Sequence, residues 1–313
     1  MINLALRNTR NARTRADNTK GRRMENFDYV APRSLAEAYA TLGNGRSRLM
    51  LAGGTDVIVQ LREGRKRCDQ LIDLKHIPDL MTFQVNSDGS LEIGAAAPLA
   101  TLYENAEIAR RFPAIVDAAT IIGGTQIQSR ASLGGNLCNA SPAADSSPAL
   151  MALGARLVIG SSTGTREIAV EDFFLGPGRS ALQPGELLVK IVVPAPRDNV
   201  GAFYHRFIPR NEMDIAVASA GVLLELDGSG QITRARVALG AVGPTPMMVP
   251  AAAQAVTGKA ANADTFALAG AAAAEAATPI TDMRGSVAQR KHLASVLTVR
   301  AFEGALARIR EGR

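Results

Sequence analysis

Two pairs of adjacent glycines are the residues of this chain best suited to bind a ligand. The first pair lies in Leu51-Ala52-Gly53-Gly54-Thr55-Asp56, and the second lies in Ser132-Leu133-Gly134-Gly135-Asn136. Neither segment contains a lysine or an arginine. Adjacent glycines allow positive φ and close approach of the backbone to a ligand, so that successive N–H groups converge on an anion. Two such loops predict a cradle for a pyrophosphate group, with one loop on each side.

Short polar side chains accompany both glycine pairs. Thr55 and Asp56 follow the first pair, and Ser132 and Asn136 flank the second. A polar run from Asn139 to Asp145 lies directly behind the second pair. A single glycine pair is often an ordinary turn, but two pairs with these neighbours favour a binding site.

The elements that would position these loops alternate between strands and helices, with no internal repeat. Ser34-Leu35-Ala36-Glu37 has the capping-box pattern of a helix start, and Asn86 to Ser90 is typical of a hairpin turn. We expect helices over residues 34–42, 99–108, 113–122, 146–153, 261–277 and 287–309, and strands over residues 48–51, 71–74, 187–193, 217–226 and 231–239. Pro194 and Pro196 mark a domain boundary at about residue 197. The order predicts an α+β fold, and no G-x-G-x-x-G supports a nicotinamide domain.

Composition excludes several classes of protein. Cys68 and Cys138 are the only cysteines and lie far apart in sequence, which argues against a disulfide scaffold and against an iron–sulfur cluster within this chain. The three histidines lack the spacing of a zinc site, so we expect no metal site. No apolar stretch is long enough to span a bilayer, and we expect a cytoplasmic protein.

The net charge of +6 belongs to the first 23 residues, which hold seven basic side chains and one acidic side chain. The remainder carries 28 basic and 28 acidic residues, so nucleic-acid binding by the body of the chain is not expected. Residues 1–23 lack the apolar stretch of a secretory signal. A disordered basic arm, a transit-like segment and translation from an upstream start codon all stay open. We favour an artefactual or dispensable extension, because Met24 begins the pattern described next.

The two glycine segments belong to a longer pattern. Residues 124–130 (Gly-Thr-Gln-Ile-Gln-Ser-Arg), 213–216 (Met-Asp-Ile-Ala), 241–246 (Ala-Val-Gly-Pro-Thr-Pro) and 279–286 (Pro-Ile-Thr-Asp-Met-Arg-Gly-Ser) complete it in order. This pattern resembles the FAD-binding medium subunits of the molybdenum hydroxylases, the superfamily of xanthine, carbon monoxide and aldehyde dehydrogenases. The resemblance implies a two-subdomain PCMH-type FAD-binding domain over residues 24–197 and a smaller α+β C-terminal domain over residues 198–313.

By this resemblance, FAD contacts come from three groups of positions. The first segment contributes Met50, Leu51, Ala52, Gly53, Gly54, Thr55, Asp56 and Val57, and the second contributes Ser132, Leu133, Gly134, Gly135, Asn136 and Asn139. Isolated positions are Ile122, Asp145, Leu187 and Arg206. Asp145 also precedes a helix and suits an N-cap. Arg206 departs from the lysine usual in the family, which replaces a point charge by a planar fork. Cys138 is interpreted as a small buried apolar filler.

The resemblance implies an electron-transfer subunit without catalytic side chains of its own. In such complexes a large molybdopterin-binding subunit hydroxylates the substrate, and a small [2Fe-2S] subunit relays electrons to FAD and then to NAD, a quinone or oxygen. A dimer of heterotrimers is expected. Two other classes stay open: a free-standing PCMH-type flavin reductase or oxidase, and a flavin-free scaffold or nucleic-acid binder that uses the basic tail.

Overall fold

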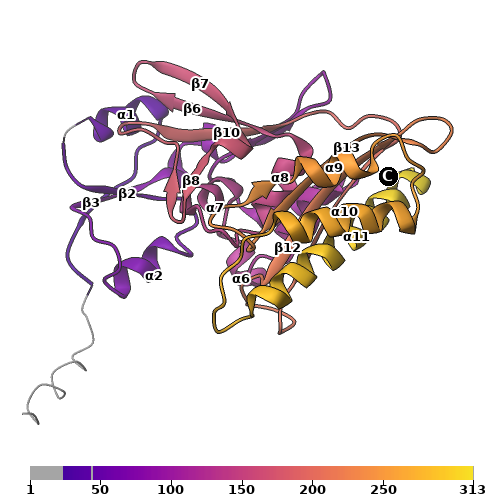
Figure 1. Ribbon diagram of the computed structural model, residues 1–313. Coiled ribbons are helices and arrows are strands. Elements are labelled where there is room, and N and C mark those ends of the chain that lie inside the picture. Colours follow the sequence, from indigo (N-terminus) through magenta and orange to yellow (C-terminus); the bar gives the residue numbers. More distant parts are fainter. Residues whose placement is uncertain (1–23, 44, 313) are drawn as a thin grey trace, which may run out of the picture.

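The computed structural model describes residues 24–43 and 45–312 (Figure 1). The predicted N-terminal extension, residues 1–23, lies outside the described residues. The mixed α+β fold is confirmed, and three larger sheets together with one two-stranded sheet organise it. The predicted boundary near residue 197 falls between the last strand of the second sheet and the first strand of the third.

The first sheet carries the first glycine segment at the end of a strand. Its three parallel strands have the order β1-β3-β2. Its elements are β1 (Asp28–Val30), α1 (Leu35–Leu42), β2 (Arg48–Leu51), α2 (Val57–Arg62) and β3 (Gln70–Asp73). Ser34 caps α1 by accepting a hydrogen bond from the N–H of Glu37 at 3.2 Å, as its sequence predicts. Since β2 and α2 are joined by residues 52–56, the chain turns sharply at the glycine pair.

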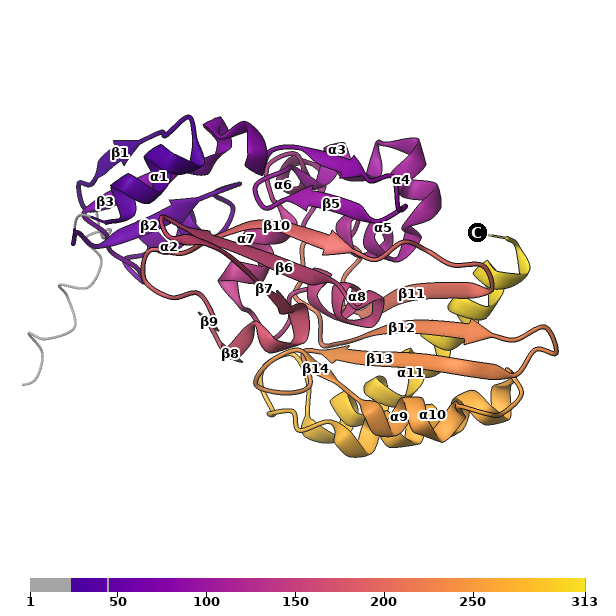
Figure 2. The same cartoon turned by 90° about the horizontal axis from the view of Figure 1, so that it is seen from above.

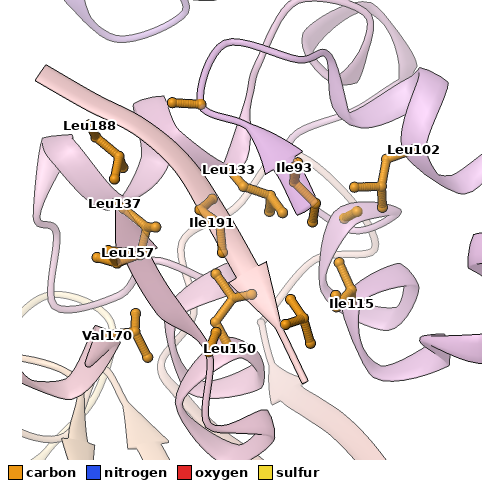
Figure 3. Packing of buried hydrophobic residues seen from close by; sticks show 14 of the residues in the cluster. Ile93, Leu102, Ile115, Leu133, Leu137, Leu150, Leu157, Val170, Leu188 and Ile191 are labelled. Atoms are coloured by element: carbon orange, nitrogen blue, oxygen red, sulfur yellow. The ribbon is translucent and has the colours of Figure 1, made fainter. Parts of the chain in front are cut away.

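The second sheet is antiparallel, with the strand order β4-β5-β10-β6-β7. Its strands are β4 (Phe83–Val85), β5 (Leu91–Gly94), β6 (Arg156–Ser161), β7 (Gly164–Ala169) and β10 (Leu187–Val193), with the small hairpin β8 (Phe174–Gly176) and β9 (Arg179–Ser180) beside it. The hairpin predicted around residues 86–90 is confirmed as the β4–β5 turn. The large central core joins this sheet to the helices that follow β5, as Figure 3 shows for Ile93, Ile191 and Leu150.

Six helices lie between β5 and β6: α3 (Leu99–Tyr103), α4 (Ala106–Arg111), α5 (Pro113–Ala119), α6 (Thr125–Gln128), α7 (Leu133–Asn139) and α8 (Ser146–Leu153). The single helix predicted over residues 99–108 is wrong, because α3 and α4 are separate. Asn105 separates the two helices because it is the N-cap of α4. Its side chain accepts hydrogen bonds from the N–H groups of Glu107 and Ile108 at 3.1 Å each. An asparagine side chain favours such a cap over a helix interior.

The C-terminal part is a four-stranded antiparallel sheet covered by helices on one face. It contains β11 (Val200–Phe207), β12 (Ala218–Leu226), β13 (Ile232–Gly240), β14 (Met247–Met248), α9 (Pro250–Val256), α10 (Ala263–Ala276) and α11 (Val287–Arg310). Figure 2 shows that α8 lies between this sheet and the second sheet, opposite α10 and α11. Gly221 of β12 allows this contact, because a Cβ there would overlap the carbonyl oxygen of Pro148 in α8.

Candidate functional site

A cavity of about 570 Å³ lies between the two glycine segments. This volume is within the range of ordinary cofactor sites. Fourteen of the eighteen predicted residues line it: Met50, Ala52, Gly53, Gly54, Thr55, Asp56, Val57, Ile122, Ser132, Gly134, Gly135, Asn136, Asn139 and Leu187. The fold therefore brings both segments to one cavity, as the sequence pattern requires of a shared ligand.

The first glycine segment presents a row of unbonded backbone donors. Gly54 has φ of +81°, a conformation that an L side chain disfavours. The N–H groups of residues 53–56 donate no hydrogen bond to the part of the chain that the structure describes. Asp56 stands at the N-cap position of α2, yet its side chain makes no capping bond. Successive free N–H groups on a tight turn suit an anion such as a pyrophosphate.

The second glycine segment is the first turn of α7, so the prediction of a loop there is wrong. Ser132 is its N-cap, and the Ser132 Oγ accepts a hydrogen bond from the N–H of Gly135 at 3.1 Å. Asn136 Oδ1 accepts a hydrogen bond from Ser146 Oγ at 2.6 Å, which fixes the amide against α8. The segment thus offers a capped helix end to the cavity.

One glycine in each pair is required by packing of the chain against itself. A Cβ at Gly53 would overlap the backbone of Arg130, and a Cβ at Gly134 would overlap the backbone of Ala95. A Cβ at Gly135 would instead lie 3.1 Å from Ser132 Oγ and 3.6 Å from the Ala52 Cβ. Packing of the chain against itself is therefore sufficient to require glycine at positions 53 and 134.

Several cavity residues were missed by the sequence analysis. Gln60 donates from Nε2 to Asn139 Oδ1 at 3.1 Å and so ties α2 to α7 across the cavity. Gln60 lies one helical turn after Asp56, and this spacing could have predicted that its side chain borders the same cavity. Lys66 also lines the cavity, although its charged run is typical of a solvated surface. Further lining residues are Arg48, Leu49, Leu74, Ala95, Leu99, Ile127, Ala131, Cys138, Ser180, Leu182, Glu186 and Leu188.

The interpretation of Cys138 as a buried filler is wrong. Its side chain is exposed and faces the cavity. Protein nevertheless surrounds the sulfur closely, and desolvation raises the pKa of the thiol to about 12. A neutral thiol at pH 7 is a poor nucleophile and a poor metal ligand.

Four predicted residues do not line the cavity. Leu51 and Leu133 are buried in hydrophobic clusters. Asp145 and Arg206 pair with each other, with Arg206 Nη1 2.6 Å from Asp145 Oδ2. Tyr204 donates from its hydroxyl to Asp145 Oδ1 at 2.7 Å. Asp145 occupies the N-cap position of α8 without a capping bond, because both of its oxygens are engaged elsewhere.

Burial dominates the electrostatics of this pair. It raises the pKa of the Asp145 carboxyl, while the charge of Arg206 and the hydrogen bonds from Tyr204 and Arg206 oppose that rise. Burial also raises the pKa of the Tyr204 hydroxyl well above its ordinary value, so this group stays protonated and donates.

Comparison with known proteins decides the family. Residues 25–196 match the FAD binding domain in molybdopterin dehydrogenase, and residues 203–305 match the CO dehydrogenase flavoprotein C-terminal domain. The chain belongs to this family of FAD-binding subunits. It is 31% identical to the xanthine dehydrogenase FAD-binding subunit of Escherichia coli O157:H7 over 285 residues, covering 90% of this chain and 97% of that protein.

A second relative and a solved structure agree with this membership. The chain is 32% identical to the carbon monoxide dehydrogenase medium chain of Afipia carboxidovorans, covering 90% of this chain and 97% of that one. A chain of the reconstituted CO dehydrogenase from Oligotropha carboxidovorans superposes with a TM-score of 0.86 at 31% identity, covering 91% of this chain and 99% of that chain. This family member is an FAD-binding oxidoreductase subunit, and the free N–H groups of residues 53–56 fit the pyrophosphate of FAD.

Residues 24–43 and 45–312 contain neither a membrane-spanning helix nor a cluster of metal-ligating side chains. No helix in these ranges is long and apolar enough to cross a membrane. In the same ranges no three histidine, cysteine or carboxylate side chains gather as a metal site would require.

Proposed function

We propose that this chain holds one non-covalent FAD in the cavity and transfers electrons from [2Fe-2S] clusters of a partner subunit to an external acceptor such as NAD, a quinone or oxygen. The observation that carries the proposal is the cavity lined by both glycine segments, with four unbonded N–H groups at residues 53–56. FAD, when bound, supplies the redox chemistry, and the protein supplies position and electrostatics.

The residues of this chain act by binding and by exclusion of water. The N–H groups of residues 53–56 and the Ser132-capped turn would hold the pyrophosphate, and the Gln60–Asn139 hydrogen bond would keep α2 and α7 at a fixed spacing. The apolar lining residues Ile122, Leu182 and Leu187 would help to exclude water from the bound flavin. Lys66 adds a positive charge to the cavity lining, which would favour a ligand that carries phosphates. No acid, base or nucleophile is assigned.

The partners are proposed from the relatives. Their names describe an FAD-binding subunit and a medium chain of dehydrogenases. We therefore propose assembly with a large molybdopterin-binding subunit and a small [2Fe-2S] subunit, as a dimer of heterotrimers. A cytoplasmic location stays a prediction.

The test is co-expression of this chain with the subunits encoded beside its gene, followed by acid denaturation of the purified complex. One equivalent of free FAD per chain is expected, together with substrate-dependent reduction of an acceptor only in the complex. FMN, or no flavin at all, would contradict the proposal. Turnover by this chain alone with added FAD would move it to the free-standing reductases and oxidases.

A further inference from the structure

Two carboxylates of the FAD-binding part hold strand β11 of the C-terminal part. Tyr204 in β11 donates from its backbone N–H to Asp117 Oδ2 at 3.1 Å and from its hydroxyl to Asp145 Oδ1 at 2.7 Å. Each carboxylate also receives one arginine of the C-terminal part. Arg308 binds Asp117 in a two-pronged pair, at 2.8 and 2.6 Å, and Arg206 binds Asp145 at 2.6 Å. The two arginine–carboxylate pairs are therefore two separate anchors of the same strand, and both are present together.

The two anchors differ in what the other arm of the arginine reaches. Arg206 Nη2 donates to the carbonyl oxygen of Ile121 at 2.6 Å, and the next residue, Ile122, lines the cavity. Arg308 Nη1 donates instead to the carbonyl oxygen of Ala202, which belongs to β11 itself. Arg206 thus joins three places at once: its own strand, Asp145 and the cavity wall.

The cavity wall at this point is a turn with few bonds of its own. Residues 120–124 connect α5 to α6, and Gly123 has φ of +61°. Among the described residues, Arg206 is the only hydrogen-bond donor to the Ile121 carbonyl. The other hydrogen bonds of residues 120–124 lie at the two ends of the turn, where Thr120 donates to carbonyls of α5 and the carbonyls of Thr120 and Gly124 accept from α6. The side chains of Arg206 and Asp145 are 5% and 10% exposed, against 15% and 19% for Arg308 and Asp117.

We propose that Arg206 is a positioning residue for the flavin, which fixes the Ile121–Ile122 turn against the bound cofactor without contacting the cofactor itself. This inference rests on the proposed FAD site. A guanidinium suits the task because its rigid fork serves two acceptors in one plane, while the ammonium of a lysine is a single point donor on a flexible stem.

The experiment compares Arg206→Met, Arg206→Lys and the matched control Arg308→Met in the full chain, purified with the subunits that it assembles with. The dissociation constant of FAD is measured by flavin fluorescence, and the environment of the bound ring by visible circular dichroism. We expect Arg206→Met to weaken FAD binding by roughly tenfold or more and to change the dichroism spectrum. Arg206→Lys should fall between Arg206→Met and the wild type.

The control separates positioning from general stability. Arg308→Met removes the less buried anchor, so it should lower Tm yet leave FAD affinity within about twofold of the wild type. Equal losses of FAD affinity in Arg206→Met and Arg308→Met would overturn the proposal, as would an unchanged spectrum and affinity in Arg206→Met. If Arg206→Met does not fold, the comparison of Arg206→Lys with Arg308→Lys decides in the same way. A wild-type complex without FAD would refute the proposed function instead.

Discussion

The two glycine pairs look alike in sequence but solve different structural problems. Gly53-Gly54 lies in an open turn between β2 and α2, with a positive φ at Gly54 and free N–H groups over residues 53–56. Gly134-Gly135 lies inside the first turn of α7, where Ser132 already bonds the N–H of Gly135. The first pair offers donors to a ligand, while the second brings a helix end close to its neighbours.

Within each pair, different physical constraints act on the two glycine positions. Gly53 and Gly134 are glycine because the backbones of Arg130 and Ala95 pass so close that no Cβ fits. Gly54 is glycine because of its φ, whereas a Cβ at Gly135 would make a tight 3.1 Å contact with Ser132 Oγ without overlapping any backbone. A motif that binds phosphate is thus partly a motif for packing two segments together.

The largest effect is expected at the packing glycines. Gly134→Ala should lower the free energy of unfolding by about 3 kcal/mol, because the new Cβ overlaps backbone that cannot move aside. Gly53→Ala should behave alike, and both losses should be the same with and without FAD. Chemical denaturation measures them. A Gly134→Ala protein that is as stable as the wild type but empty of flavin would reverse this assignment.

A smaller effect is expected at Gly54. Alanine there must adopt φ of +81°, which costs about 1–2 kcal/mol, and its Cβ would lie 2.8 Å from the flexible end of Leu51. The variant should fold, but the turn should relax toward negative φ and misalign the free N–H groups. We expect FAD affinity to fall by more than stability does. Equilibrium dialysis beside thermal denaturation would reveal the opposite order.

Gly135→Ala should separate binding from folding most cleanly. Alanine is favoured over glycine in helices by about 1 kcal/mol, which offsets the tight 3.1 Å contact with Ser132 Oγ. Stability should stay near that of the wild type, while the added methyl in the cavity lining weakens FAD binding. Gly228→Ala is the control, since its Cβ would meet nothing within 4 Å. Equal FAD affinity in both variants would remove Gly135 from the site.

Cys138 offers a chemical probe of the same cavity. With a pKa of about 12, its thiol should react with iodoacetamide slowly at pH 7, and the rate should rise about tenfold per pH unit without a plateau below pH 10. FAD should block this reaction. Cys68 does not line the cavity and serves as the internal control, so mass spectrometry of both peptides reports protection directly. Protection of neither cysteine would place FAD elsewhere.

The first segment could be predicted from sequence because its function is local. The predicted strand and the two glycines follow one another directly, and Gly53 to Asp56 needed no distant partner to be recognised, although helix α2 was not predicted. The capping of α7 was also readable from Ser132, but two glycines argued against a helix there because glycine is a poor helix former. The charged run around Lys66 gave no sign that it borders a cavity.

The arginine anchors could not be predicted from sequence. Arg206 and Asp145 are 61 positions apart and lie in different parts of the fold, so no spacing rule joins them. Two residues that the sequence analysis predicted to bind the cofactor pair with each other instead, because an unpaired buried charge is costly. Only the packing of β11 against α5 and α8 reveals which of the two occurs.

The central claim is that the cavity between the glycine segments holds FAD by the free N–H groups of the first segment. An experimental structure of the FAD-loaded complex tests this most directly. The account predicts phosphate oxygens within hydrogen-bonding distance of N–H groups of residues 53–56, with Gly135 facing the cofactor and Arg206 still bound to Asp145. A pyrophosphate bound elsewhere, with these N–H groups facing water, would contradict it.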